Sequence, residues 1–319
     1  MNKTAPVKKE TAQRIKMVID KLNYIRDGMA IGLRTGKTRN IGIITLNIAN
    51  SFYPSLIDAI EEIAFKNNYS VTISCNYYDI ERERKHLDNF ISNGVAGLIL
   101  CSGINDMNLI RNVQQHDIPL VALDRKIDDD SIPYVGIDNY KAFYNATNYL
   151  IKAGHKKIYY LTEPTIMRTL EDRLSGYKKA LADNKIKLEK DWLIIDERLQ
   201  NNKVEGGYEV FYKLLKKNKL PDAVFGVADT VIYGAMKAAY DSGYKIPEDI
   251  SFIGNNDIYL SKYLMPELAT IKWQKKEMGR KAIELLFDLI NKKSIKNKKY
   301  IFKTEIIGRK TVKFKKSNQ

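Results

Sequence analysis

The sequence has very few of the residues that build disulfide frameworks and metal centres. Cys75 and Cys101 are the only two cysteines in 319 residues, and the three histidines, His86, His116 and His155, are scattered. Each cysteine lies in or at the end of an apolar strand pattern, which favours reduced thiols in a protein core. No Cys or His cluster has metal-ligand spacing, so we expect neither a metal nor a cofactor.

Long apolar runs are also missing. No stretch approaches the about 18 apolar residues of a membrane span, and the first residues lack the apolar stretch of about 7–15 residues found in a secretory signal. We therefore expect a cytoplasmic chain with no membrane partner.

Motifs that cradle nucleotides or activate a nucleophile are absent from the sequence too. No G-x-G-x-x-G and no G-x-x-x-x-G-K-[ST] follows a strand pattern, and Ser102 lacks the G-x-S-x-G context of a nucleophile elbow. The acidic run at 128–130 is typical of a solvated turn. The sequence therefore predicts a protein that is not an enzyme.

The net charge of +15 is concentrated at the two ends of the chain. Residues 1–40 carry ten basic and three acidic side chains, and residues 291–319 carry eleven basic and one acidic, so the segment between them is nearly neutral. Basic ends on a neutral body are typical of a protein that faces phosphates. The lysine-rich composition of the whole chain is an alternative reason for the basic C-terminal segment.

From Arg39 onward, short apolar strand patterns alternate with amphipathic helix patterns. This alternation is typical of doubly wound α/β folds, whose parallel sheets are covered by helices on both faces. So many units would make one very large sheet, so we expect two similar lobes. The strand patterns lie at 41–45, 69–75, 96–101, 118–123, 134–137, 156–161, 192–195, 223–227 and 250–254.

Polar side chains follow the carboxyl ends of several of these strands. Open α/β sheets bind ligands at that edge, so two lobes whose edges face each other would form a cleft for a small polar molecule. The pattern favours a binding site over a reaction site. The residues at the strand ends are Asn50 with Phe52 and Tyr53, Asp124 with Arg125, Asp138 with Asn139, Asp229, and the run Asn255–Asp257.

Several segments resemble regulators of the LacI/GalR family. The segment at 22–61 is similar to the junction between the DNA-binding headpiece and the core of that family. Further matches follow in order along nearly the whole chain: VAGLILCSG (95–103), PLVALDR (119–125), VGIDN (135–139), LIKAGHKKIYYL (150–161), RLSGYKKAL (173–181), the segment at 223–257, LMPELATIKWQKKEMGRKA (264–282) and TEIIGR (304–309).

The resemblance implies a two-lobed, periplasmic-binding-protein-like core over 39–319, behind a headpiece and hinge at 1–38. It places lobe one at about 39–137 and 272–298, and lobe two at about 138–271 and 299–319. Three crossovers would join the lobes, near Ile137-Asp138, Ile271-Lys272 and Lys298-Tyr300. An effector such as a sugar or a nucleobase would bind between the lobes.

The positions that match the family's effector-binding residues offer aromatic faces, a planar guanidinium and hydrogen-bonding groups. Asn256 stands where many family members have Asp, which leaves the class of effector open. Asp138 could instead cap the following helix, and Arg173 could instead support the core edge. The matching positions are Phe52, Tyr53, Arg125, Asp138, Arg173 and Asn256.

The headpiece departs from the family pattern. Residues 2–24 resemble the turn and third helix of a helix-turn-helix unit, with Lys8 and Thr11 as candidates for phosphate contacts, whereas a first helix and a recognition helix are lacking. Either the coding region begins upstream of Met1, or the protein is natively headless.

The hinge pattern at 26–34 contains Gly28 and Gly32, each of which disfavours a helix by roughly 1 kcal/mol relative to Ala. We expect a hinge that orders only on DNA. Leu33 matches the family's minor-groove wedge, or else packs against a partner hinge, and Arg34 beside it is a further candidate for a DNA contact.

The resemblance as a whole predicts a homodimeric transcriptional repressor. Its affinity for operator DNA would be set by a small effector, a sugar or related metabolite, bound between the lobes. The alternative from a different class is a headless cytoplasmic sugar-binding protein without sequence-specific DNA binding.

Overall fold

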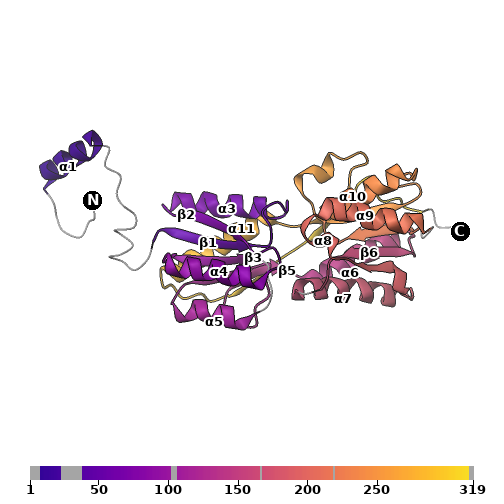
Figure 1. The fold of residues 1–319 in the computed structure, drawn as a ribbon, viewed down its shortest axis with the longest axis horizontal. Coiled ribbons are helices and arrows are strands. Elements are labelled where there is room, and N and C mark those ends of the chain that lie inside the picture. Colours follow the sequence, from indigo (N-terminus) through magenta and orange to yellow (C-terminus); the bar gives the residue numbers. More distant parts are fainter. Residues whose placement is uncertain (1–7, 23–37, 102–105, 166, 218–219, 316–319) are drawn as a thin grey trace.

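Two lobes, each built on a six-stranded sheet, lie side by side along the long axis of the molecule (Figure 1). The computed structural model describes residues 8–22, 38–101, 106–165, 167–217 and 220–315. The helices are α1 (Lys9–Lys21), α3 (Tyr53–Lys66), α4 (Ile80–Ser92), α5 (Met107–Gln115), α6 (Asn139–Lys152), α7 (Arg168–Asp183), α8 (Arg198–Asn201), α9 (Lys203–Lys216), α10 (Asp229–Asp241) and α11 (Lys275–Ile290), with 3₁₀ turns η1 (Lys190–Trp192) and η2 (Tyr259–Lys262).

The sheet of the first lobe has the strand order β11-β5-β4-β3-β1-β2, and every neighbouring pair is parallel. Its central strands are short apolar runs with both faces covered. For example, all five residues of β3 are buried. Helices α3 and α11 pack on one face, and α4 and α5 on the other (Figure 1). The strands are β1 (Asn40–Thr45), β2 (Ser70–Cys75), β3 (Gly97–Cys101), β4 (Leu120–Leu123), β5 (Tyr134–Ile137) and β11 (Lys299–Phe302).

The sheet of the second lobe has the order β12-β10-β9-β8-β6-β7 and is parallel except for β12, which pairs antiparallel with β10. Helices α9 and α10 pack together on one side of the sheet, and α6 and α7 on the other (Figure 1). The strands are β6 (Ile158–Thr162), β7 (Leu193–Ile195), β8 (Ala223–Gly226), β9 (Ser251–Asn256), β10 (Ala269–Lys272) and β12 (Glu305–Ile307). The expected α/β architecture with two parallel-sheet lobes is therefore confirmed.

The chain crosses between the lobes three times. The first crossing follows β5, at Ile137, and the second follows β10, at Lys272. The third lies between Phe302 and Glu305, because β11 pairs with β5 of the first lobe. The expected third crossover at Lys298-Tyr300 is therefore wrong, and residues 299–302 belong to the first lobe.

The N-terminal segment contributes one described helix, α1, which has no buried side chain. Lys8 and Thr11 lie exposed at its start, and the other two candidate DNA contacts, Leu33 and Arg34, lie outside the described residues. Among the described helices, none combines the length and apolar character that crossing a bilayer requires.

Candidate ligand-binding cleft

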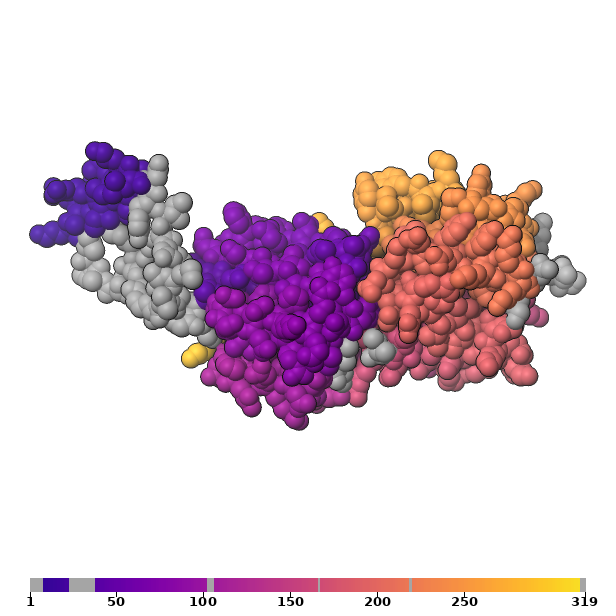
Figure 2. All heavy atoms as spheres, viewed as in Figure 1, coloured from indigo at the N-terminus to yellow at the C-terminus, as the bar shows by residue number. Residues whose placement is uncertain are grey.

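The carboxyl ends of strands from both sheets line one small cavity between the lobes. Its volume is about 40 Å³, which leaves room for ordered water but is well below the roughly 300 Å³ at which typical ligand pockets begin. In Figure 2 the surfaces of the two lobes meet along their boundary. The lining residues include Asn50, Phe52, Tyr53, Tyr78 and Asp124 from the first lobe and Glu163, Arg173, Lys203, Val227 and Asn256 from the second.

An aromatic wall forms the side of this cavity at the start of α3. The Asn50 side chain accepts a hydrogen bond from the Phe52 backbone N–H at 3.1 Å and so fixes the turn after β1. The Phe52 ring packs edge-on against Trp273, 5.0 Å between centroids, and against Tyr53 at 5.3 Å. The Trp273 indole N–H in turn donates to Asn255 Oδ1 at 2.8 Å. Trp273, which lies in the second crossover, therefore connects the Phe52 ring of the first lobe to the sheet of the second lobe.

Arg173 reaches the cavity from α7 of the second lobe and is only 8 % exposed. Its Nε donates to Asn139 Oδ1 at 2.7 Å, and its guanidinium lies over the rings of Phe143 and Trp273, at 5.5 and 5.4 Å from their centroids. Gly176, one turn further along α7, permits this placement. A Cβ there would lie 2.2 Å from the Tyr140 carbonyl oxygen, so only glycine lets α7 pack this closely on α6.

Asp124 faces Arg173 from the first lobe, with 3.9 Å between the carboxylate and the guanidinium. Burial raises the pKa of Asp124 to about 6, although the charge of Arg173 opposes that rise. Its Oδ1 is buried and has no hydrogen-bond partner among the described residues. A carboxylate held this way can accept a hydrogen bond from a polar ligand.

A second polar cluster joins the lobes at Glu163. The Tyr78 hydroxyl of the first lobe donates to Glu163 Oε2 at 2.5 Å, and Lys203 Nζ donates to the same oxygen at 3.0 Å. Burial, and then the charge of Glu163, hold the pKa of the Tyr78 hydroxyl well above its usual range. Tyr78, Glu163 and Lys203 were not among the expected site residues. Tyr78 and Glu163 lie just beyond the ends of β2 and β6. The rule that ligands bind at the carboxyl ends of parallel strands, here called the strand-end rule, leads to both residues when it is applied to those two strands.

Four of the six expected effector-binding residues, Phe52, Tyr53, Arg173 and Asn256, line the cavity. Arg125 does not line it. Its guanidinium is buried inside the first lobe, 2.5 Å from Glu83, whose other oxygen accepts from Asn76 at 2.7 Å. Asp124 has a left-handed backbone, with φ of 53°. It is Asp124, one residue before Arg125, that faces the cleft.

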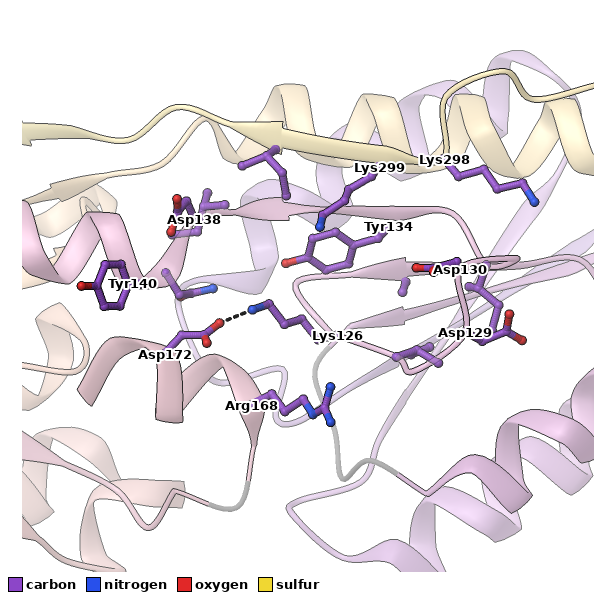
Figure 3. A pocket seen from close by; sticks show the side chains of 16 residues that line it. Lys126, Asp129, Asp130, Tyr134, Asp138, Tyr140, Arg168, Asp172, Lys298 and Lys299 are labelled. Carbon is purple, nitrogen blue, oxygen red and sulfur yellow. Dashed lines mark hydrogen bonds and ion pairs between the residues drawn. The ribbon is translucent and has the colours of Figure 1, made fainter. Parts of the chain in front are cut away.

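Asp138 also lies outside this cavity. It is exposed and caps α6, because its Oδ1 accepts from the Lys141 backbone N–H at 2.9 Å. The structure thus gives Asp138 the alternative role, that of a helix cap. It lines a separate hollow of about 460 Å³, shown in Figure 3, together with Lys126, Tyr134, Arg168 and Asp172. Across this hollow Lys126 pairs with Asp172, and Arg168 pairs with Asp128 beside it, so two further ion pairs join the lobes.

Comparison with known proteins identifies the class to which this chain belongs. Residues 38–315 match the family described as periplasmic binding proteins and sugar binding domain of the LacI family. The chain belongs to this family. It is 32% identical over 316 residues to the HTH-type transcriptional repressor PurR of Histophilus somni, covering 98% of this chain and 93% of that one. It is 30% identical to the HTH-type transcriptional regulator RegA of Clostridium saccharobutylicum, with the same coverage.

Solved structures agree with this assignment. The lac repressor dimer bound to operator and an anti-inducer has the same fold, with a TM-score of 0.84 at 23% identity, over 98% of this chain and 93% of that one. A LacI family regulator from Enterococcus faecium with bound ribose has a TM-score of 0.77 at 26% identity, over 87% of this chain and all of that one. The chain is thus a transcriptional regulator and not an enzyme. Relatives named as helix-turn-helix regulators favour this reading over a sugar-binding protein without DNA binding.

Proposed function

We propose that this chain is a homodimeric repressor whose affinity for operator DNA is set by a small polar effector, a sugar or related metabolite, bound in the cleft between the lobes. The observation that carries the proposal is the buried pair of Arg173 and Asp124, which face each other from different lobes across the cavity. A buried cation and a buried carboxylate at one lobe boundary are suited to a ligand rich in hydroxyl groups, which both donates and accepts hydrogen bonds.

The remaining lining groups suit the same class of ligand. The Asn256 side chain can donate and accept, the Glu163 carboxylate can accept from hydroxyls, and Phe52 offers an aromatic edge or face. The regulator from Enterococcus faecium, which shares 26% identity with this chain, was solved with ribose. A nucleobase, whose ring can also stack on an aromatic side chain, is the competing ligand in the test.

Effector binding would change how the lobes sit together. A cavity of about 40 Å³ cannot enclose a sugar ring, so the ligand must separate the lobes or replace contacts between them. The Tyr78–Glu163 hydrogen bond, the Arg173–Asp124 pair and the Lys126–Asp172 pair all cross that boundary. The first lobe carries β1, and the chain before β1 leads to the basic headpiece, so a rotation of the lobes would move the two headpieces of a dimer relative to each other.

We place the dimer contact at an apolar surface of the second lobe. Met265 is 99 % exposed and Tyr240 is 76 % exposed, around a hollow of about 870 Å³. Apolar side chains gathered in this way on an otherwise charged protein mark a binding surface. A second copy of the chain, bringing the same patch, is the occupant that we propose. Tyr259, Leu260 and Tyr263, in the segment that leads to Met265, are exposed as well.

The experiment uses the two tryptophans of the chain. Trp192→Phe leaves Trp273, which touches both Phe52 and Arg173, as the only tryptophan. Titration of this variant with a panel of monosaccharides, sugar phosphates and nucleobases should give a saturable change in emission with one class of compound, together with a rise in melting temperature.

Arg173→Ala in the same background should abolish both signals. The matched control, Arg198→Ala, removes a surface arginine of the same lobe that pairs with Asp196 and should leave both signals unchanged. A panel without any hit, or a hit that Arg173→Ala binds as tightly, would contradict the proposed site.

A further inference from the structure

The loop at 291–298, between α11 and β11, is a run of exposed basic residues. Lys292, Lys293, Lys296 and Lys298 are all exposed. Lys292 follows the end of α11 in the left-handed conformation, with φ of 55°, so the helix ends there and the chain turns back toward β11. Neither the effector cleft nor the dimer patch uses this loop.

The loop lies at the edge of the first sheet formed by the amino ends of its strands, where the N-terminal segment also enters the lobe, and three strands separate β11 from β1. All six strands of that sheet run in the same direction, and the loop precedes β11 just as Arg39 precedes β1. The last turn of α11 also reaches this edge, because Phe287 packs against Tyr69, 5.1 Å between ring centroids, and the next residue, Ser70, pairs with Asn40 of β1. Figure 2 shows yellow spheres from the C-terminal part of the chain at the end of this lobe that lies toward α1.

The charge at this edge is mostly unneutralised. Lys293 pairs with Asp288 at 3.1 Å, and nearby Lys66 pairs with Glu62 at 2.6 Å. No ion pair of Arg39, Lys292 or Lys296 occurs within the described residues. These three cations therefore add positive charge at the end of the lobe from which the basic N-terminal segment extends.

We propose that the 291–298 loop is a second phosphate-contacting surface, which binds the backbone of duplex DNA beside the segment contacted by the headpiece. The inference rests on the proposed DNA-binding function and extends it to the core. Lysines on a loop contact phosphates as point charges and without sequence preference. Each contact releases counterions from the DNA, so its contribution to the affinity depends on the salt concentration. A lysine near a helix C-terminus also interacts favourably with the helix dipole, which would affect stability but not DNA binding.

The test measures binding of the full chain to a labelled random-sequence duplex by fluorescence anisotropy, from 50 to 200 mM KCl. The variant is Lys292→Gln with Lys293→Gln and Lys296→Gln. The control is Lys185→Gln with Lys187→Gln and Lys190→Gln, in the loop after α7 of the second lobe. The two sets match closely, because Lys185 is also left-handed just beyond a helix end (φ of 56°) and Lys187 also pairs with a nearby carboxylate, that of Glu189 at 3.7 Å.

We expect the slope of log Kobs against log salt to become shallower by about 2 to 3 in the 292/293/296 variant, since each phosphate contact contributes roughly 0.9. The control should keep the wild-type slope, and replacement of the same three loop lysines by arginine should restore it. The two glutamine variants should melt alike, because each loses a lysine just beyond a helix end. If the 292/293/296 glutamine variant melts at a lower temperature than the control, the arginine variant still tests the proposal, because it keeps the positive charge at all three positions.

A wild-type slope in the 292/293/296 variant, or an equal loss in the control, would overturn this inference and leave the proposed repressor function intact. Absence of duplex binding by the wild-type chain would overturn both.

Discussion

The hydroxyl of Tyr78, in the first lobe, donates a 2.5 Å hydrogen bond to the Glu163 carboxylate of the second lobe. Lys203 holds the same carboxylate oxygen from within the second lobe, so Glu163 is oriented whether or not the lobes are closed. The lobe movement that we propose for effector binding would break this hydrogen bond, so Tyr78 tests whether this boundary governs closure.

Tyr78→Phe should favour the open arrangement of the lobes. A hydrogen bond to a charged group contributes about 1.5–3 kcal/mol, so the closed form should lose roughly tenfold or more in population. Small-angle X-ray scattering should show a larger radius of gyration for this variant. Tyr77→Phe is the control, since Tyr77 is 37 % exposed and its ring contacts Arg82 within the same lobe. Equal radii for both variants and the wild type would refute the role of Tyr78.

Arg125→Met should destabilise the first lobe strongly, because it leaves Glu83 as a buried charge without its cationic partner. Removing one member of a buried pair costs about 3–5 kcal/mol, whereas a double variant with Glu83→Leu should recover most of that loss. Urea denaturation measures both. Arg84→Ala, which removes an exposed pair with Glu81, should change the free energy of unfolding by less than about 1 kcal/mol. A small effect of Arg125→Met would mean that Arg125 does not neutralise Glu83.

The stabilisation that Asp124 and Asp229 contribute to the fold should fall as the pH rises from about 4 to about 6. Burial raises the pKa values of Asp124 and Asp229 from 3.8 to about 6, so the folded state holds these protons over a range in which the unfolded chain releases them. Stabilisation by the bound proton is complete below pH 4 and lost above pH 6, by up to about 3 kcal/mol for each group.

Asp124→Asn should therefore make the dependence of the unfolding free energy on pH less steep in this range, by up to one proton equivalent. Urea denaturation at half-unit steps from pH 4 to 7 measures the change. Asp128→Asn, at an exposed position of the same loop, is the control. A wild-type slope in Asp124→Asn would show that Asp124 titrates normally.

Met265→Lys combined with Tyr240→Lys should weaken the proposed dimer. Truncating or charging central interface side chains typically costs 2 kcal/mol or more each, so the dimer dissociation constant should rise by at least about 100-fold. Sedimentation velocity across micromolar concentrations gives the constant. Phe65→Lys, at a position 73 % exposed on the first lobe, should not change it. Dimers that persist in the Met265/Tyr240 variant would place the interface elsewhere.

The alternating pattern in the sequence predicted the two parallel sheets because their central strands are short apolar runs buried on both faces, as in β3 and β9. It failed at β11, a partly exposed edge strand of the sequence KYIF, whose alternating burial carries no such signal. The family resemblance, which placed the third crossover, set it too early, because 299–302 pair with β5.

The strand-end rule and the family resemblance together led to four of the residues that line the cavity, but not to all of them. Arg125 was expected where Asp124 lies, because a left-handed residue at the end of β4 shifts the facing side chain by one position. Tyr78 was missed because the strand-end rule was not applied to β2, which ends at Cys75. The backbone between them is also left-handed at Tyr77 (φ of 51°), and nothing in the sequence marks that turn.

The central claim is that the cleft controls DNA binding. Once an effector is identified, duplex affinity is measured by anisotropy with and without it, for the wild type and for Arg173→Ala. We predict a change of about 5- to 150-fold in the wild type and none in Arg173→Ala, while the duplex affinity of the two ligand-free proteins is equal. The same change in both proteins, or no change in a wild type saturated with effector, would contradict it.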